Sequence, residues 1–312
     1  MLNFRTDLAL ERRNLFKKAN NILNEVDGLE TQEERFADDI KISRVKVVND
    51  NGEHAIGKRK GTYITIDIKN LKIAGEDEIQ KASEAVTKEL KSLIGGLVGP
   101  QEDILVVGLG NLYVTPDALG PKVVNEIDIT RHLLNYMPEV LDKGTRPVSA
   151  IAPGVLGTTG IETLEVIKGI VENIHPKLII VIDALASRSI ERISSTVQLA
   201  DTGIIPGAGV GNERKELTKD TLGVPVIAIG IPTVVEAATI AADSLDLFIR
   251  KVQEEAKSNE FLNQLQEDKY EMIKEVLTPE DYNFIVTPKE IDDLIENMKD
   301  VVARGINFAT QK

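Results

Sequence analysis

The sequence contains no cysteine and no tryptophan, and only 4% of its 312 residues are aromatic. Without cysteine, the chain can form no disulfide, thiolate metal site or cysteine nucleophile. So few aromatic side chains also make base stacking on single-stranded nucleic acid unfavourable. The three histidines, His54, His132 and His175, include no pair at metal-ligand spacing. We therefore expect no metal and no cofactor.

Basic residues and long apolar runs are also scarce. The 37 basic residues are outnumbered by 50 acidic ones, which leaves a net charge of -13 and a pI of about 4.9. This balance argues against direct nucleic-acid binding. No uncharged run approaches the length of a membrane span, and the first residues lack the order of a signal peptide. The composition predicts a folded cytoplasmic protein.

Short apolar runs alternate with helical patterns through the middle of the chain, over about residues 103–256. Continuous β-branched strands separated by helices are typical of a parallel sheet covered on both faces. We expect strands at 104–109, about 148–152, 178–182 and 224–229, and helices at 117–136, 159–174, 189–199 and 233–256.

The two ends of the chain show other patterns. Residues 8–27 have helical spacing, and residues 40–68 alternate as two antiparallel strands turning at Asn51-Gly52. A charged helix is expected at 76–94. The tail, 257–312, is charged and helical, with Thr-Pro helix starts at Thr278 and Thr287. The fold class is therefore α/β: a mostly parallel twisted sheet with helices on both faces, an added antiparallel β piece and a helical C-terminal region.

Two strand-like runs each lead into the tripeptide Asp-Ala-Leu, at Asp117 and Asp183. Carboxylates that follow parallel strands point into the crevice where open α/β sheets bind ligands. Two acids that meet there can share one proton, so that one acts as base and the other as acid. Structural roles are open too, because Asp117 suits the first turn of a helix and Arg188 could neutralise Asp183. A charge at the end of five apolar residues is nevertheless costly unless it is paired or functional.

Two glycine-rich segments, 108–111 and 207–212, fit neither G-x-G-x-x-G nor the P-loop pattern. We attribute their glycines to tight turns and close backbone approach. Asp201-Thr202-Gly203 has the letters of the pepsin-type triplet, which acts in an all-β setting. We interpret it as a turn after a helical segment.

Five blocks resemble the germination protease (spore protease) family of endospore-forming bacteria. The likeness runs from Arg5 to about residue 250, and the tail is less diagnostic. The blocks are residues 107–121, 152–162, 181–188, 201–212 and 228–236.

The resemblance implies an atypical aspartic endopeptidase whose fold is similar to that of hydrogenase-maturation proteases. It also implies small acid-soluble spore proteins as substrates, a homotetramer made as a zymogen, and a place in the cytoplasm of the developing spore and the spore core. The family's catalytic aspartates match Asp117 and Asp183. We expect one to activate water and the other to donate a proton. Asn111, Thr115 and the amides that begin the helix at 117 are candidates for the oxyanion, and Arg188 for binding an acidic substrate residue or tuning Asp183.

The same resemblance extends to the N-terminus, where family zymogens cut themselves after an acidic and a hydrophobic residue. Asp7, Leu8 and Ala9 fit that pattern, whereas Leu10 stands where a small residue is expected. We therefore expect autocleavage between Leu8 and Ala9, with residues 1–8 as propeptide and 9–312 as a single peptidase domain. Alternatively, this stretch merely begins a helix capped by Thr6 or Asp7, and both can hold.

Two further functions remain open from the sequence. Gly-Leu-Gly-Asn at 108–111 is similar to a segment of peptidyl-tRNA hydrolase, an esterase that needs a catalytic histidine and a basic face. The charge of -13 disfavours that function. The other alternative is a non-catalytic binding protein on the same fold, which the presence of both aspartates disfavours. The charged ends and the β piece at 40–68 are expected to supply some of the subunit contacts.

Overall fold

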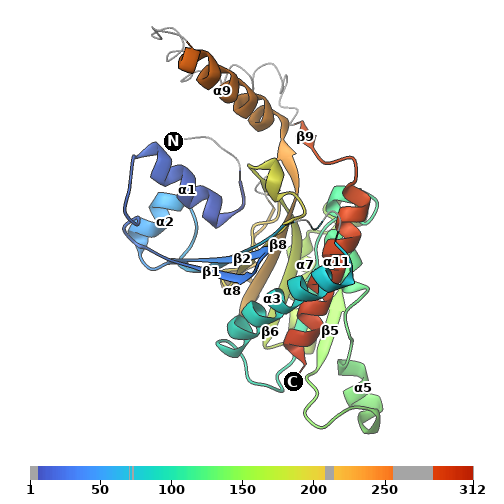
Figure 1. Ribbon diagram of the computed structural model, residues 1–312. Helices are drawn as coiled ribbons and strands as arrows, with labels where there is room; N and C mark the ends of the chain where they lie inside the picture. The colour runs from blue at the N-terminus through green and yellow to red at the C-terminus, as the bar shows by residue number, and fades with distance from the viewer. Residues whose placement is uncertain (1–5, 70, 72–73, 208–213, 256–283, 312) are drawn as a thin grey trace.

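The computed structural model describes residues 6–69, 71, 74–207, 214–255 and 284–311 (Figure 1). The predicted helix start at Thr278 and the glycines within 208–213 lie outside these residues. The described chain forms a nine-stranded sheet in the order β1-β2-β3-β7-β8-β6-β4-β5, with β9 paired to β8. The strands are β1 (Leu29–Ala37), β2 (Ile40–Val47), β3 (Gly61–Ile68), β4 (Ile104–Gly108), β5 (Val148–Ile151), β6 (Leu178–Ser187), β7 (Thr196–Ala200), β8 (Val226–Glu236) and β9 (Ile285–Val286).

Helices follow or precede most strands, in the alternation expected of an α/β chain. The α-helices are α1 (Ala9–Ala19), α2 (Asp50–Ile56), α3 (Glu76–Gly95), α4 (Leu119–Val124), α5 (Arg131–Tyr136), α6 (Leu156–Thr159), α7 (Thr163–Ile174), α8 (Lys219–Leu222), α9 (Ala237–Glu255) and α11 (Ile291–Thr310). Short 3-10 turns are η2 (Thr115–Asp117), η3 (Pro138–Val140) and η4 (Ile190–Arg192).

The sheet is mixed. Strands β8, β6, β4 and β5 pair in parallel, which confirms the predicted parallel core. The remaining pairs are antiparallel, and β3 pairs with β7, so the N-terminal β piece continues the same sheet. The expected α/β class is therefore confirmed, but the sheet is mixed and not mostly parallel, because five of its eight strand pairings in the described chain are antiparallel.

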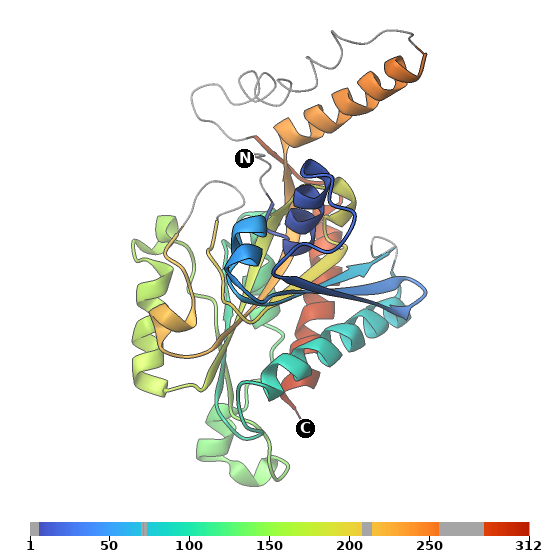
Figure 2. The ribbon, with the colours of Figure 1, turned by 90° about the vertical axis from the view of Figure 1, so that its left-hand side faces the viewer.

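Helices cover both faces, as predicted. On one face α3 and α11 lie side by side and, with α4, pack on the Ile and Val side chains of the sheet (Figures 1 and 2). On the other face α7 and α8 cover the β4–β6 end, and α1 and α2 cover the β1–β3 end. Alternate residues of β6 serve the two faces: Ile180 and Ile182 join the first core, Ile179 and Val181 the second. The candidate site lies on the second face, between its two apolar clusters.

Several predicted elements were wrong. The helix expected at 189–199 is the turn η4 followed by strand β7, whose five residues are all buried between β3 and β8. The helix expected at 117–136 is divided into η2, α4 and α5. Asn51-Gly52 lies inside α2, because the Asn49 side chain accepts from the Gly52 N–H and caps a helix there.

Other boundaries shifted for identifiable reasons. The first helix ends at Ala19 instead of residue 27, and the following strand β1 was not predicted because its edge position needs little apolar alternation. Strand β8 extends to Glu236, fully buried, so helix α9 begins only at Ala237. The helix expected after Thr287 begins at Ile291.

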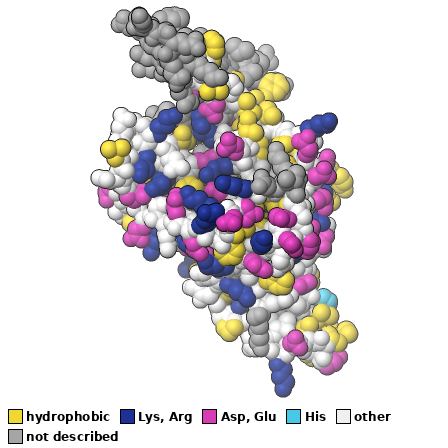
Figure 3. All heavy atoms as spheres, in the orientation of Figure 1, with side chains coloured by type: hydrophobic (Ala, Val, Ile, Leu, Met, Phe, Trp, Pro, Cys, Tyr) yellow, Lys and Arg dark blue, Asp and Glu magenta, His cyan; other side chains and the backbone are white. Residues whose placement is uncertain are grey.

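The surface agrees with the charge pattern of the sequence. Over the face shown in Figure 3, lysine and arginine side chains are interspersed with aspartate and glutamate, with no broad basic area. Among the described residues, no helix combines the length and apolar composition needed to cross a membrane. Helix α9 projects away from the sheet (Figure 1) and exposes Leu247 and Phe248.

Candidate active site

Asp183 lies on β6 at the point where β4 separates from it. The last β4 pair is Gly108 with Ile182, and the next N–H, of Leu109, donates to the Ile182 carbonyl at 2.8 Å. Strand β8 accompanies β6 to Ser187, so Asp183 lies within a strand, although it is level with the carboxyl end of β4. Its side chain is 5% exposed. Asp183 was predicted at the end of its own strand. It lies instead inside β6, level with the end of the neighbouring strand β4.

The electrostatics of Asp183 favour its protonated form. Burial raises its pKa well above the usual value, and the charges of Asp117 and Asp7 raise it further. One contact opposes this shift: the Ala184 N–H donates to Oδ1 at 3.0 Å. The charge of Asp117 therefore reaches Asp183, the other predicted carboxylate.

Asp117 ends the turn η2, which Pro116 helps to begin. Its Oδ2 accepts the Asn111 N–H at 2.8 Å. Burial raises the pKa of Asp117, and this hydrogen bond lowers it. Asp117 is therefore a partly buried carboxylate held by the loop that follows β4.

Glycines allow that loop to pass close to Asp117. Gly110 has φ +114°, and a Cβ there would lie 2.0 Å from the Asp117 carbonyl oxygen. A Cβ at Gly108 would lie 2.1 Å from the Gly120 carbonyl oxygen. Close backbone approach, as predicted, accounts for the glycines at 108 and 110.

The supporting residues occupy structural positions. The Asn111 Oδ1 accepts from the Tyr113 N–H at 3.0 Å, which closes the loop. The amides of Asp117 and Ala118 donate to the carbonyls of Val114 and Thr115, at 2.8 and 3.1 Å. Both amides are thus already used within the turn, and an oxyanion would have to displace these bonds.

Arg188 contacts acidic residues other than Asp183. Its guanidinium pairs with Asp243 of α9, and its N–H donates to the Glu11 carboxylate at 2.9 Å. The charges that shift the pKa of Asp183 are those of Asp117 and Asp7. In this arrangement Arg188 ties β6 to α1 and α9.

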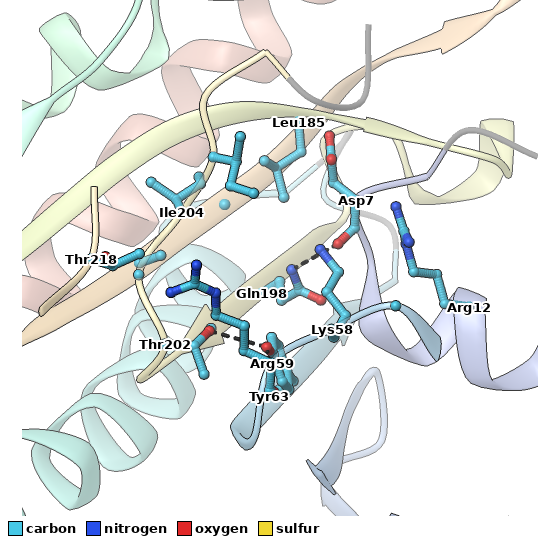
Figure 4. Close-up of a pocket in the computed structure, with 16 residues that line it drawn as sticks. Asp7, Arg12, Lys58, Arg59, Tyr63, Leu185, Gln198, Thr202, Ile204 and Thr218 are labelled. Atoms are coloured by element: carbon cyan, nitrogen blue, oxygen red, sulfur yellow. Dashed lines mark hydrogen bonds between the residues drawn. The ribbon is translucent and has the colours of Figure 1, made fainter. Parts of the chain in front are cut away.

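A third carboxylate, Asp7, joins the site and was not predicted there. Its N–H donates to the Ala186 carbonyl at 3.1 Å, and its Oδ2 accepts the Ala186 N–H at 3.1 Å. Gln198 of β7 donates to the Asp7 carbonyl at 3.3 Å (Figure 4). Burial raises the pKa of Asp7. Among the influences that lower it, the charge of Lys58 is the largest. No local sequence signal announces this contact, since Asp7 and Ala186 are 179 positions apart.

The expected cleavage position follows Asp7 directly. Leu8 and Ala9 are fully buried. The Ala9 N–H donates to Gln198 Oε1 at 2.7 Å, and the Leu8 carbonyl accepts the Arg12 N–H at 3.1 Å. The N-cap of α1 is Leu8, so the predicted caps Thr6 and Asp7 were wrong. The peptide bond between Leu8 and Ala9 is held on both sides by hydrogen bonds.

A cavity of about 280 Å³ adjoins these groups on the same face of the sheet (Figure 4). Gly230, the β8 partner of Asp183, lines it, as does Leu185, the next residue of β6 on this face. A Cβ at Gly230 would lie 2.2 Å from Leu185, so glycine lets this side chain lie across β8. The lining also includes three cationic residues, Arg12, Lys58 and Arg59.

Asp201-Thr202-Gly203 is a turn, as interpreted from the sequence, although it follows strand β7 and not a helix. Asp201 Oδ1 accepts the Thr62 N–H at 2.8 Å, and the Thr202 hydroxyl donates to Tyr63 at 3.1 Å. Within the described chain, no three His, Asp or Glu side chains are grouped as metal ligands.

Comparison with known proteins adds independent findings. A family model described as "Germination protease" matches residues 6–267 and 260–312. The germination protease of Clostridium perfringens is 48% identical over 316 residues, covering 100% of this chain and 96% of that protein. The germination protease of Caldanaerobacter subterraneus is 49% identical, covering 100% of this chain and 95% of that protein. That of Priestia megaterium is 43% identical, covering 98% of this chain and 93% of that protein.

Among solved structures, a NiFe hydrogenase maturation protease from Thermococcus kodakarensis aligns with 18% identity and a TM-score of 0.29. The alignment covers 46% of this chain and 80% of that one.

Proposed function

The chain belongs to the germination protease family and is an endopeptidase, and from that premise we propose that it degrades small acid-soluble spore proteins during germination. Asp117 and Asp183 act in this proposal as an acid–base pair. The observation that carries it is that Asp183 is buried next to a cavity lined by its β8 partner Gly230, within reach of the charge of the half-buried Asp117. The proposed place of action is the cytoplasm of the developing spore and the spore core.

The different surroundings of the two acids suggest different roles. Asp183 is the more deeply buried acid and carries the larger upward pKa shift, so it keeps its proton and acts as the acid. Asp117 is less buried and accepts an N–H, which favours its ionised form. It takes a proton from the attacking water while Asp183 protonates the carbonyl oxygen or the leaving nitrogen. Asn111 and Thr115 hold the loop that positions Asp117.

The catalytic pair is tested with Asp117→Asn and Asp183→Asn, each assayed on a small acid-soluble spore protein. Each substitution should lower kcat/KM by about 100-fold or more, because a general acid or base contributes that much. Asp38→Asn is the matched control, since Asp38 is fully exposed and distant from the site. A folded variant of either site aspartate that keeps near-normal cleavage would refute the assignment.

We further propose that residues 1–8 are a propeptide removed by autocleavage between Leu8 and Ala9. In the described structure this bond is buried and hydrogen-bonded on both sides, so the segment must first leave the sheet. Departure of residues 1–8 would also remove the Asp7 charge from beside Asp183. The chain described is in this proposal the uncleaved form.

Acidification should promote this step. Asp183 has a raised pKa, so falling pH supplies the pair with the one proton that it needs for cleavage. Incubating the full chain at mildly acidic pH and sequencing the product should give Ala9 as the new N-terminus. A different first residue, or equal processing by Asp183→Asn alone in solution, would contradict self-cleavage at this bond.

A further inference from the structure

Lys58 is a cation at the edge of the candidate site. It follows the left-handed Gly57 that ends α2, and its half-buried side chain lines the cavity (Figure 4). Within the described part of the chain, its ammonium makes no hydrogen bond and no direct ion pair. Burial lowers the pKa of Lys58 to about 8. Removing an ammonium from water is costly unless an anion compensates, and the charge that favours the ammonium form of Lys58 is that of Asp7.

The other two cations of the cavity are already used. The Arg59 guanidinium pairs with Glu216 at 2.7 Å and with Asp220 at 3.4 Å. Arg12 donates to the carbonyls of Thr6 and Ile56, at 2.9 and 3.4 Å. Among the described residues, Lys58 is therefore the cavity cation whose ammonium keeps its hydrogen-bonding capacity for a carboxylate.

Asp7 identifies the kind of anion that fits. The negative charge of Asp7 is the largest influence that raises the pKa of Lys58. In turn, the positive charge of Lys58 is the largest influence that lowers the pKa of Asp7. Asp7 also bonds to the backbone of β6 at Ala186: its N–H donates to the Ala186 carbonyl, and its carboxylate accepts the Ala186 N–H. An acidic residue of a peptide, two positions before a cut bond, thus already lies next to Lys58 and Asp183.

We propose that Lys58 is a specificity-determining residue that binds an acidic side chain of the substrate, and that Asp7 occupies this place within the uncleaved chain. This inference rests on the proposed function. Once residues 1–8 have left, Lys58 and the cavity face the β6 edge without Asp7. A substrate peptide then pairs with Ala186 in its turn and places its own acid next to the ammonium.

The test uses three peptides that differ at one position, two residues before the cut, where they carry Glu, Gln or Lys. They are assayed with the processed wild-type chain and with Lys58→Met and Lys58→Glu. Wild type should prefer Glu over Gln by about tenfold or more in kcat/KM, because a site built for a charged group rejects a neutral analogue. Lys58→Met should reduce this ratio to about 1, and Lys58→Glu should favour the Lys peptide.

Lys60→Met is the matched control. Lys60 is exposed, belongs to the same loop and pairs with Asp50 at 2.6 Å, so its loss should leave the preference intact. Cleavage by Lys58→Met with an unchanged Glu/Gln ratio would overturn the inference and leave the proposed function standing. If processed wild type cleaves none of the peptides or spore proteins, the proposed function fails and this inference falls with it.

A measurement on wild type alone covers the case in which the Lys58 variants do not fold. Asp7, Arg12, Arg59 and Tyr63 are the other titratable groups of the cavity; of these only Asp7 is removed on processing, and burial raises the pKa of Tyr63 to about 12. The Lys58 pKa of about 8 holds for the uncleaved chain, where the Asp7 charge raises it, so in the processed chain the ammonium should lose its charge at or below pH 8 and the Glu/Gln ratio should fall there. Effects on Asp117 and Asp183 cancel in the ratio. A ratio that stays constant from pH 6 to pH 10 would overturn the proposal.

Discussion

Asp183 is an acid that the folded chain holds out of water, next to two other acids. Its folded-state pKa is raised, so the folded state binds the proton more tightly than the unfolded chain. The free energy of unfolding therefore falls as pH rises from about 4 through the folded pKa. An acid that weakens the fold at neutral pH is typical of a functional position.

Asp183→Asn should remove this pH-dependent loss of stability, because asparagine does not ionise. At pH 7 to 8 the variant should have the larger free energy of unfolding, and the difference should shrink toward pH 4. Urea unfolding of both proteins across this range measures it, with Asp38→Asn as control. A variant that is less stable than wild type at pH 8 and equal to it at pH 4 would contradict the raised pKa.

Gly110 holds Asp117 in place through backbone geometry alone. Gly110→Ala should destabilise the fold by about 1–3 kcal/mol, the usual cost of a strained residue, since φ is +114° and the new Cβ would meet the Asp117 carbonyl. The resulting shift of Asp117 should also lower kcat by roughly 100-fold. Thermal unfolding and a cleavage assay measure the two effects.

Gly169→Ala is the control for this prediction. Gly169 lies inside α7, and a Cβ there meets nothing within 4 Å. Alanine should therefore stabilise that helix, by up to about 1 kcal/mol, without changing activity. Unaltered activity in Gly110→Ala would show that the backbone at 110 does not position Asp117.

At the scale of elements, strand β7 secures the N-terminal segment. Gln198 accepts the Ala9 N–H and donates to the Asp7 carbonyl, so it contacts both sides of Leu8. The segment otherwise depends on Ala186 of β6 and on the contacts of the buried residues Thr6 and Leu8. Release of this segment from β6 and β7 is the step that we expect to limit processing.

Gln198→Ala should speed the appearance of the chain that begins at Ala9. Two hydrogen bonds of about 1 kcal/mol each are lost, so release should become about tenfold or more favourable. N-terminal sequencing over time at mildly acidic pH measures the rate. Gln80→Ala is the matched control, because the Gln80 side chain bonds with Glu84 on the surface of α3, away from the N-terminal segment. A rate that Gln198→Ala leaves unchanged would mean that another contact limits release.

At the scale of the whole molecule, exposed apolar side chains lie along α9 and around β9. Phe248 is 61% exposed, and both residues of β9 are exposed. The area also includes Leu247 and Phe284. Exposed apolar groups of this kind mark an interface more often than free surface. We assign this area to contacts between subunits, together with those proposed for the β piece.

Light scattering of the purified protein should report a tetramer, and Phe248→Asp should shift the population toward smaller species, because a charge would be buried in the interface. Tyr136→Asp is the control, since Tyr136 is 83% exposed on the distant helix α5. A monomeric wild-type protein at micromolar concentration would contradict the tetramer. A tetramer unchanged by Phe248→Asp would place the interface elsewhere.

The sequence by itself determined the parallel core and its two candidate acids. Apolar runs such as 104–108 and 178–182 are buried on both faces of the sheet, so every residue of each run is apolar or glycine. Asp183 stands out because it follows directly on such a run, and Asp117 because the same tripeptide, Asp-Ala-Leu, follows the run at 104–108. Local periodicity was sufficient for these features because the physical cause, burial, acts residue by residue.

Only the tertiary structure decided which distant segments meet. Thr196–Ala200 is a strand because β3 and β8 supply its hydrogen bonds, and its five residues alone do not distinguish strand from helix. In the same way, Asp7 reaches Ala186, and Lys58 reaches the cavity, through pairings between segments far apart in the chain. Such contacts depend on the free energy of closing the whole sheet, and no local pattern of residues records them.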